Sequence, residues 1–183
     1  GSRSPEEWEP AVKRAESLHL QLMAGIWPLP WRYNNNGTWT ANPEGIQFLR
    51  LMRQYPKTVI GMYGFNEPYW TNPATGRNDF ECGFYTADDL RAFRRMIRSY
   101  WPEARIYHDL GEPSYWAPGG KLHRRRSCIG NKYRDQTEIA DFVGVWWFPF
   151  EIDGYKKESA LADLREEIQF IREKMSPAEP VLV

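Results

Sequence analysis

Five short apolar runs alternate along this chain with longer segments of helical periodicity, and this alternation leaves few possible folds. The runs are rich in β-branched and aromatic residues and are bounded by Pro, Gly or polar residues, as strands buried on both faces are. The pattern therefore predicts five strands, at residues 20–28, 58–65, 104–111, 141–150 and 180–183.

The segments between these runs predict helices. Asn42 is a suitable N-cap because Pro43 follows it at the first helical position. Thr86 begins a capping-box pattern, with Asp89 at the third helical position in place of the usual Glu or Gln. We expect helices at residues 5–18, 43–55, 86–101 and 157–174, and a short helical stretch at 135–140.

Alternating strands and helices indicate repeated right-handed βαβ units and hence an α/β fold with a parallel sheet. Residues 25–33, GIWPLPWRY, follow the first strand without a GxGxxG pattern, which disfavours a doubly wound dinucleotide-binding sheet. The loops after strands are long and aromatic and those before strands are short, which is typical of a (β/α)8 barrel. A complete barrel has about 250 residues. With 183 residues and five strands, we expect a partial TIM barrel.

The length predicts one domain, which we place at residues 5–183. Gly1-Ser2 resembles an expression scar, so residues 1–4 are set aside as a linker, and the lack of a signal peptide says nothing about export. A partial barrel is either a piece of a longer protein or an open half-barrel. In both cases its edge strands need cover, from the missing barrel segments or from a second chain.

Composition excludes several classes of protein. Lys+Arg and Asp+Glu both number 24, so the net charge is zero and no long-range attraction to nucleic acid or anionic lipid is expected. No run approaches the roughly 18 apolar residues that a membrane span needs. Aromatic residues make up 15% of the chain, with nine Trp and ten Tyr. This exceeds what so small a core uses, and exposed aromatic faces stack well on sugar rings.

The stretch from Thr58 to Trp70, TVIGMYGFNEPYW, carries the clearest chemical signal. A carboxylate such as Glu67 at the end of a buried parallel strand is partly desolvated, which raises its pKa toward the range for proton exchange near neutrality. Asn66 can hold a substrate hydroxyl, and Pro68 restricts the turn that orients the Glu. The alternative is that Glu67 caps a helix or pairs with an Arg of the following loop.

The segment GFNEP at a strand end, within βα units with aromatic loops, resembles the acid/base motif after the fourth barrel strand of clan A glycoside hydrolases, a group that includes cellulase-like and mannanase-like families. The resemblance covers nearly the whole chain, with the five predicted strands matching barrel strands three to seven. It implies a retaining hydrolase of β-linked oligo- or polysaccharide that uses no cofactor. Glu67 would be the general acid/base, and Asn66 would bind the sugar 2-hydroxyl.

A retaining mechanism requires a second carboxyl group about 5 to 5.5 Å from the first. The resemblance places this nucleophile, a Glu, at the end of strand seven, and the sequence stops at Val183 inside that strand. We therefore expect the nucleophile just beyond Val183. Asp109 and Glu112 after strand five and Glu151 after strand six are weaker candidates, because loop carboxylates are mostly solvated or paired.

Trp27 and Trp70 are expected to be sugar platforms, together with one of Trp146 and Trp147, since consecutive strand residues point to opposite faces. His108, near the end of strand five, either contacts sugar or is a core histidine. The alternative is that half of the loop aromatics, with Trp27 and Trp70 among the candidates, only pack the loops against the fold. They include Trp31, Tyr69, Tyr115 and Trp116.

Cys82 and Cys128 fall in the loops after strands four and five, where they form either a disulfide or two free thiols. A disulfide would suit a secreted or extracytoplasmic protein. The three His residues and two Cys show no metal-binding spacing, so no metal site is predicted. The basic run 121–126 is expected to be a solvated loop, because the chain as a whole carries no net positive charge. The neighbouring Gly119-Gly120-Lys121 is not a phosphate loop, because Leu122 stands where Ser or Thr is required.

Two alternatives to a hydrolase remain. The first is a non-catalytic glycan-binding pseudoenzyme that has the same aromatic cleft and lacks the nucleophile. The second is a barrel-fold scaffold with no sugar ligand, because one fold supports many functions.

Overall fold

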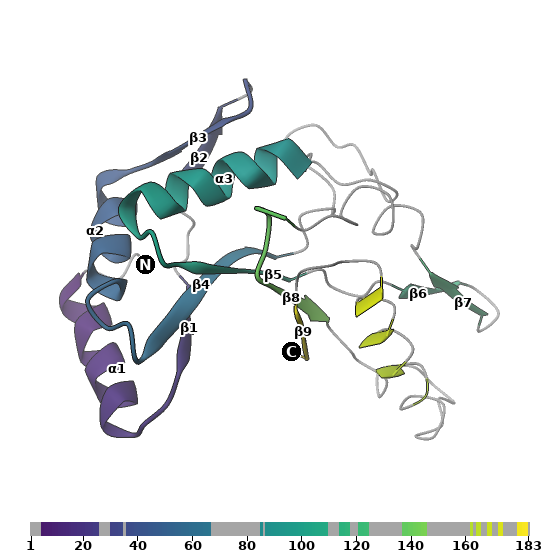
Figure 1. The fold of residues 1–183 in the computed structure, drawn as a ribbon, viewed down its shortest axis with the longest axis horizontal. Helices are drawn as coiled ribbons and strands as arrows, with labels where there is room; N and C mark the ends of the chain where they lie inside the picture. Colours follow the sequence, from purple (N-terminus) through teal and green to yellow (C-terminus); the bar gives the residue numbers. More distant parts are fainter. Residues whose placement is uncertain are drawn as a thin grey trace. The chain divides into compact units, whose positions relative to one another are not determined.

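The computed structural model describes residues 5–25, 30–34, 36–66, 85, 87–109, 114–117, 121–124, 137–145 and 179–182, together with 162, 164–165, 168–169 and 172–173. Figure 1 labels the helices and strands. In chain order they are α1 (Pro5–Ser17), β1 (Leu22–Ala24), β2 (Trp31–Asn34), β3 (Thr38–Ala41), α2 (Pro43–Met52), β4 (Val59–Asn66), α3 (Ala87–Tyr100), β5 (Arg105–Asp109), β6 (Ser114–Ala117), β7 (Lys121–Arg124), β8 (Phe142–Val145) and β9 (Glu179–Leu182).

The main sheet has five strands in the order β1-β4-β5-β8-β9. β1 pairs in parallel with β4, and β8 pairs in parallel with β9. Each new strand is added on the same side of the previous one, as around a barrel. A doubly wound sheet would instead reverse its order at a switch point. The order confirms the predicted fold class, an α/β fold with a parallel, partial barrel-type sheet.

All five strands predicted from the apolar runs are present in the sheet. The helices predicted near residues 5, 43 and 86 correspond to α1, α2 and α3. The side chain of Asn42 accepts a hydrogen bond from the backbone N of Gly45 at 2.8 Å, so Asn42 is the N-cap of α2 as expected. Thr86, the predicted cap of α3, lies outside the described residues.

The helical stretch predicted at residues 135–140 is wrong in the part that is described. Residues 137–139 form a turn, and Glu138 has a φ of 61°. This left-handed backbone conformation cannot continue a right-handed helix. In the region 157–174, every described residue is helical; Leu164 and Ile168 are half-buried and the others are exposed, which agrees with the predicted amphipathic helix.

Two antiparallel hairpins lie in regions that the sequence analysis treats as loops. β2 pairs with β3 across the turn at Asn36 and Gly37, where Gly37 has a φ of 80°. β6 pairs with β7. The first four residues of the basic run 121–126 therefore form strand β7, and the expectation of a loop is wrong there because pairing with β6 supplies the backbone hydrogen bonds.

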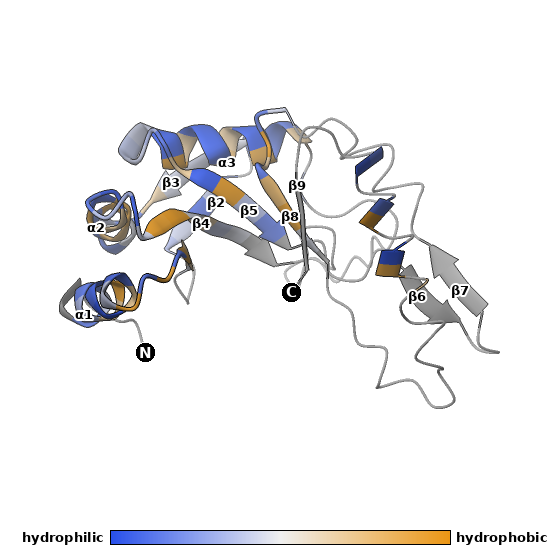
Figure 2. Cartoon of the chain, turned by 60° about the horizontal axis from the view of Figure 1, so that its bottom comes forward, coloured by the Kyte–Doolittle hydropathy of each residue, from blue (hydrophilic) through white to orange (hydrophobic). Residues whose placement is uncertain are grey.

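The fold divides into two compact units, Gly1–Gly64 with Asp88–Tyr107, and Phe65–Ala87 with His108–Val183. In the first unit, α3 runs alongside β4 and β5 (Figure 1), and Figure 2 shows hydrophilic and hydrophobic residues mixed along α3, as expected for a helix with one buried face. Phe48 of α2 is buried against Trp8 of α1, with ring centroids 5.0 Å apart. Phe93 of α3 and Met62 of β4 are fully buried.

Candidate active site

The Asn-Glu-Pro motif follows an interior strand of the sheet. β4 ends at Asn66 and has β1 on one side and β5 on the other. The carboxyl ends of barrel strands form the edge at which barrel enzymes bind their substrates. Glu67 and Pro68 are the next residues in the sequence and lie outside the described residues, and only the backbone of Asn66 is described. The strand end predicted for the motif is therefore confirmed.

Two tyrosine rings lie against each other in the middle of β4 and β5. The ring centroids of Tyr63 and Tyr107 are 5.3 Å apart. Side chains alternate along a strand, so the fully buried Met62 and Ile106 point to the opposite face. Tyr107 is buried, whereas Tyr63 is half-buried. Tyr63 is thus the less enclosed residue of the pair.

Sequence reasoning missed this tyrosine pair. The sequence does contain a usable signal. Side chains alternate between the two faces of a strand, and Tyr63 stands four residues, an even number, before Glu67 in the sequence. Gly25, just after β1, leaves room beside the pair, since a Cβ at this position would lie 3.3 Å from the Cβ of Tyr63. A small residue at that position keeps the Tyr63 ring from being crowded.

His108, predicted to contact sugar or to belong to the core, is the next residue after Tyr107 in β5. Its side chain is 1% exposed. Because Tyr107 shares a face with Tyr63, alternation places His108 on the face of Ile106. This enclosure agrees with a core histidine. Contact of His108 with sugar stays a prediction.

Most other predicted site residues lie outside the described residues. These are Glu67, Trp27, Trp70, Trp146, Trp147, Glu112, Glu151, Cys82 and Cys128. Trp31 is described, and only 8% of it is exposed. Its ring packs against Phe93 of α3 with centroids 6.2 Å apart. Trp31 is therefore one of the aromatics that pack a connecting segment down.

A buried carboxylate joins the β2–β3 hairpin to α3. Oδ1 of Asp89 accepts a hydrogen bond from the Tyr33 hydroxyl at 3.0 Å, and the backbone oxygen of Asp89 accepts one from Trp39 Nε1 at 2.8 Å. Asp89 is 8% exposed. We call these three residues, Tyr33, Trp39 and Asp89, the hairpin clamp. Burial raises the pKa of the Tyr33 phenol, and the hydrogen bond to Asp89 raises it further.

An open pocket of about 540 Å³ lies at the other end of the strands. Its lining includes Val59 and Ile60 at the start of β4, Arg105 at the start of β5, and Arg53 and Glu103 in the loops before them. Arg53 caps the carboxyl end of α2, where the helix dipole favours a cation. Its Nε lies 3.8 Å from Glu103 Oε2, and both side chains are more than half exposed. An ion pair that is this exposed adds little to the stability of the fold.

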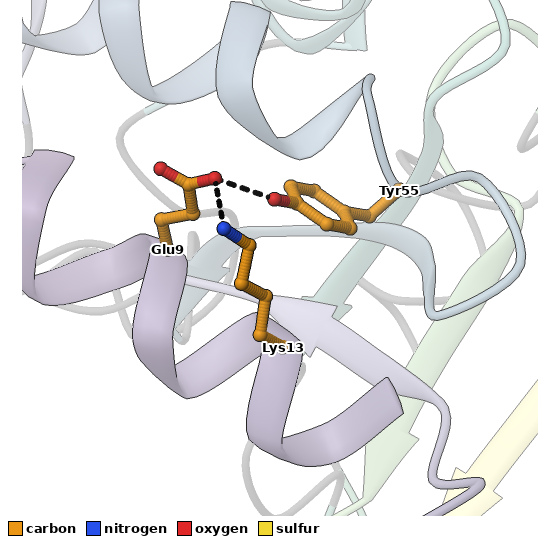
Figure 3. Close-up of polar contacts among 3 residues, drawn as sticks. All are labelled: Glu9, Lys13 and Tyr55. Atoms are coloured by element: carbon orange, nitrogen blue, oxygen red, sulfur yellow. Dashed lines mark hydrogen bonds and ion pairs between the residues drawn. The ribbon is translucent and has the colours of Figure 1, made fainter. Parts of the chain in front are cut away.

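A second polar cluster, drawn in Figure 3, joins α1 to the segment after α2. Glu9 Oε1 accepts hydrogen bonds from Lys13 Nζ and from the Tyr55 hydroxyl, each at 2.8 Å. The hydrogen bond from Lys13 and then that from Tyr55 lower the pKa of Glu9. The hydrogen bond to Glu9 raises the pKa of Tyr55. Lys13 is exposed, whereas Glu9 and Tyr55 are half-buried, and the cluster belongs to the helix layer.

Among the residues that the structure describes, no group of three or more His, Cys, Asp or Glu side chains is placed to hold a metal ion. In the same part of the chain, no helix combines the length and apolarity needed to cross a membrane.

No protein-family profile and no curated protein sequence matches the chain. Among solved structures, it is similar to the spore cortex-lytic enzyme SleL of Bacillus cereus, with a TM-score of 0.42 and 14% sequence identity. The alignment covers 96% of this chain and 46% of the enzyme, so the chain spans less than half of that protein's length. The fold class stated above rests on the strand order of the chain's own sheet.

Proposed function

We propose that this chain is the acid/base-bearing part of a retaining β-glycoside hydrolase. The observation that carries the proposal is the position of the Asn-Glu-Pro motif, directly after an interior strand of a partial barrel-type sheet. This is the edge at which barrel enzymes bind substrate. The resemblance of GFNEP to the acid/base motif of clan A hydrolases supports the same role.

In the proposed reaction, the Glu67 carboxyl group gives its proton to the glycosidic oxygen while the bond between that oxygen and the anomeric carbon breaks. The carboxylate nucleophile, expected beyond Val183, forms a new bond to the same carbon. Glu67, now ionised, then takes a proton from the water that attacks the glycosyl-enzyme, and the nucleophile leaves. Asn66 would hold the sugar 2-hydroxyl during both steps.

The proposed substrate is a β-linked oligo- or polysaccharide bound along aromatic side chains. Tyr63, which is half-buried beside Tyr107, is proposed as one of these side chains because it stands an even number of residues before Glu67 in the sequence. Trp27, Trp70 and one of Trp146 and Trp147 are proposed as further platforms. An aromatic ring with one accessible face can stack on the apolar face of a sugar.

We also propose that the protein acts outside the cytoplasm, with a disulfide between Cys82 and Cys128. Intact-mass measurement of the unreduced protein, before and after thiol alkylation, tests the disulfide. No alkylation without reductant is expected. Uptake of two alkyl groups by the native or denatured unreduced protein would contradict the disulfide and remove this support for export.

The test of the function uses Glu67→Gln in the parent protein that contains this chain, with hydrolysis of cellohexaose or mannohexaose compared with that of aryl glycosides bearing good leaving groups. We expect kcat on the oligosaccharide to fall at least about a hundredfold, and kcat on the aryl glycoside to fall much less, because a good leaving group needs little acid assistance. The matched control is Glu103→Gln, the same chemical change at a residue 70% exposed beside the amino end of β5.

Equal losses on both substrates, or no loss on either, would contradict the role of Glu67. Binding of oligosaccharide by the parent protein without any hydrolysis would instead identify the glycan-binding pseudoenzyme.

A further inference from the structure

The open pocket at the amino ends of β4 and β5 is formed by residues that take no part in the proposed reaction. All of its described lining residues belong to one compact unit, Gly1–Gly64 with Asp88–Tyr107. Its volume of about 540 Å³ falls within the roughly 300–1,000 Å³ of small-molecule sites. The pocket is therefore large enough for a small organic ligand.

Two hydrogen-bonded turns form the walls of the pocket. After α2, the backbone N of Val59 donates a hydrogen bond to the oxygen of Tyr55 at 2.7 Å. After α3, the backbone N of Ala104 donates one to the oxygen of Trp101 at 3.0 Å. Because these bonds fix both turns, little conformational entropy would be lost when a ligand binds between them.

One part of the lining is apolar. Val59 and Trp101 are 2% and 3% exposed, and Ile60 is half-buried. Pro56, which also lines the pocket, is exposed. A ligand with an apolar body would cover Ile60 and Pro56 and remove their surface from water, which favours binding.

The other part of the lining is charged, and its charges do not balance. Arg53 and Arg105 are cationic and Glu103 is anionic, which leaves one positive charge in excess. Arg53 Nε and Glu103 Oε2 are 3.8 Å apart, which is beyond hydrogen-bond distance, and both side chains are more than half exposed. Glu103 therefore neutralises Arg53 only weakly. A ligand with one negative charge would balance this lining.

The carboxyl-terminal ends of α2 and α3 reduce this positive charge without reversing it. The partial negative charge at the end of a helix acts within its last turn. Arg53 is the C-cap of α2 and offsets that charge there. Arg105 belongs to β5 and lies beyond the last turn of α3, so the helix end affects its charge less.

We propose that this pocket binds a small monocarboxylate with an apolar body, such as an aromatic or fatty acid. The carboxylate binds to the guanidinium of Arg105, whose paired N–H donors match two carboxylate oxygens, and Arg53 adds a second positive charge. The apolar body covers Pro56 and Ile60. A phosphate monoester, with nearly two negative charges at neutral pH, fits the single excess charge less well. This site does not depend on the proposed glycosidase function.

Single charge changes at the pocket test the proposal with effects of opposite sign. Arg105→Gln removes the main partner of the carboxylate, and Arg53→Gln removes the second cation. Glu103→Gln removes the negative charge that repels the ligand. The matched control is Arg50→Gln, because Arg50 is exposed in the last turn of α2 and is not a lining residue of the pocket.

The first measurement is calorimetric titration of this chain with 4-phenylbutyrate and with octanoate at low salt. We expect the Kd of Arg105→Gln to rise at least about tenfold and that of Arg53→Gln about threefold. The Kd of Glu103→Gln should fall about threefold, and that of Arg50→Gln should stay within about twofold of wild type. The uncharged 4-phenylbutyramide should bind at least about tenfold more weakly than the acid.

Three outcomes of the titration would overturn the proposal. They are no binding of either acid by the wild-type chain, equal affinity for the acid and the amide, and equal effects of Arg50→Gln and Arg53→Gln. Arg53 and Glu103 are exposed, so their variants decide the matter even if Arg105→Gln does not fold.

The second measurement locates the ligand by amide NMR. Addition of 4-phenylbutyrate should shift the backbone amide signals of Ile60 and Arg105 and leave that of Ala15 in α1 unchanged. Shifts confined to residues outside the pocket would overturn the assignment of the site, whatever the value of the Kd.

Discussion

The ring of Tyr63 on β4 lies against the ring of Tyr107 on β5, with an interplanar angle of 40° between them. Such a pair adds about 0.5–1.5 kcal/mol beyond the area that it buries. It joins two neighbouring strands of the sheet, β4, which ends at Asn66, and β5, which ends at Asp109.

Tyr107→Ala is expected to destabilise the fold more than Tyr63→Ala. Tyr107 is 5% exposed, so truncating it should cost about 3–5 kcal/mol in the free energy of unfolding, as for a buried aromatic residue. Tyr63 is half-buried, and its loss should cost less. Urea unfolding of the two variants measures both values. Equal losses would show that half-buried Tyr63 contributes as much to stability as buried Tyr107.

Gly61→Ala is expected to destabilise the sheet strongly. A Cβ at position 61 would lie 2.5 Å from the backbone oxygen of Arg105, and backbone cannot move aside as a flexible side chain can. We expect a loss of at least about 1–3 kcal/mol in unfolding free energy. The control is Gly25→Ala, whose Cβ would meet the Cβ of Tyr63 at 3.3 Å and needs a smaller adjustment. Thermal unfolding followed by circular dichroism compares them, and a larger loss in Gly25→Ala would refute the prediction.

Asn42→Ala is expected to cost about 1 kcal/mol, because the backbone N of Gly45 at the start of α2 loses its side-chain acceptor. Asn42→Asp keeps an acceptor oxygen at the cap and adds a negative charge that the helix dipole favours. Its stability should therefore equal or exceed that of the native chain. Chemical denaturation distinguishes the two variants, and an Asp variant as unstable as the Ala variant would rule out capping as the cause.

Tyr33 is expected to ionise later than an ordinary tyrosine. Burial raises its pKa first, and the hydrogen bond to Asp89 adds to the shift. A pKa that is higher in the folded state contributes stability that is complete below the unfolded value of about 10 and is lost as pH rises through the folded pKa. Tyr33→Phe should therefore lose less stability in this alkaline range. Titration of phenolate absorbance in the native chain and in Tyr33→Phe should show that the variant lacks one tyrosine with a raised pKa. If the tyrosine missing from the variant has an ordinary pKa, the raised pKa of Tyr33 is contradicted.

The five strands of the sheet could be predicted because each is a short run of apolar residues that can be recognised from consecutive positions in the sequence. The β2–β3 hairpin is harder to recognise, although Asn36-Gly37 between alternating residues is a hairpin signal. The two strands of the hairpin are short and partly polar. The residues that they contact, Asp89 and Phe93 of α3, are far away in the sequence. The turn at Glu138 escaped prediction because composition alone does not reveal a left-handed backbone at a non-glycine residue.

Local patterns in the chain were enough to establish the alternation of strands and helices, the barrel-type class and the strand end at which the Asn-Glu-Pro motif stands. A buried strand or an amphipathic helix produces a hydrophobic pattern within a few neighbouring residues, so the sequence shows it directly. The enclosure of His108, the packing of Trp31 and the hairpin clamp emerged only in the folded chain. The two bonds of the clamp join residues 50 and 56 positions apart, and partners at such distances are brought together by packing, which no local pattern encodes.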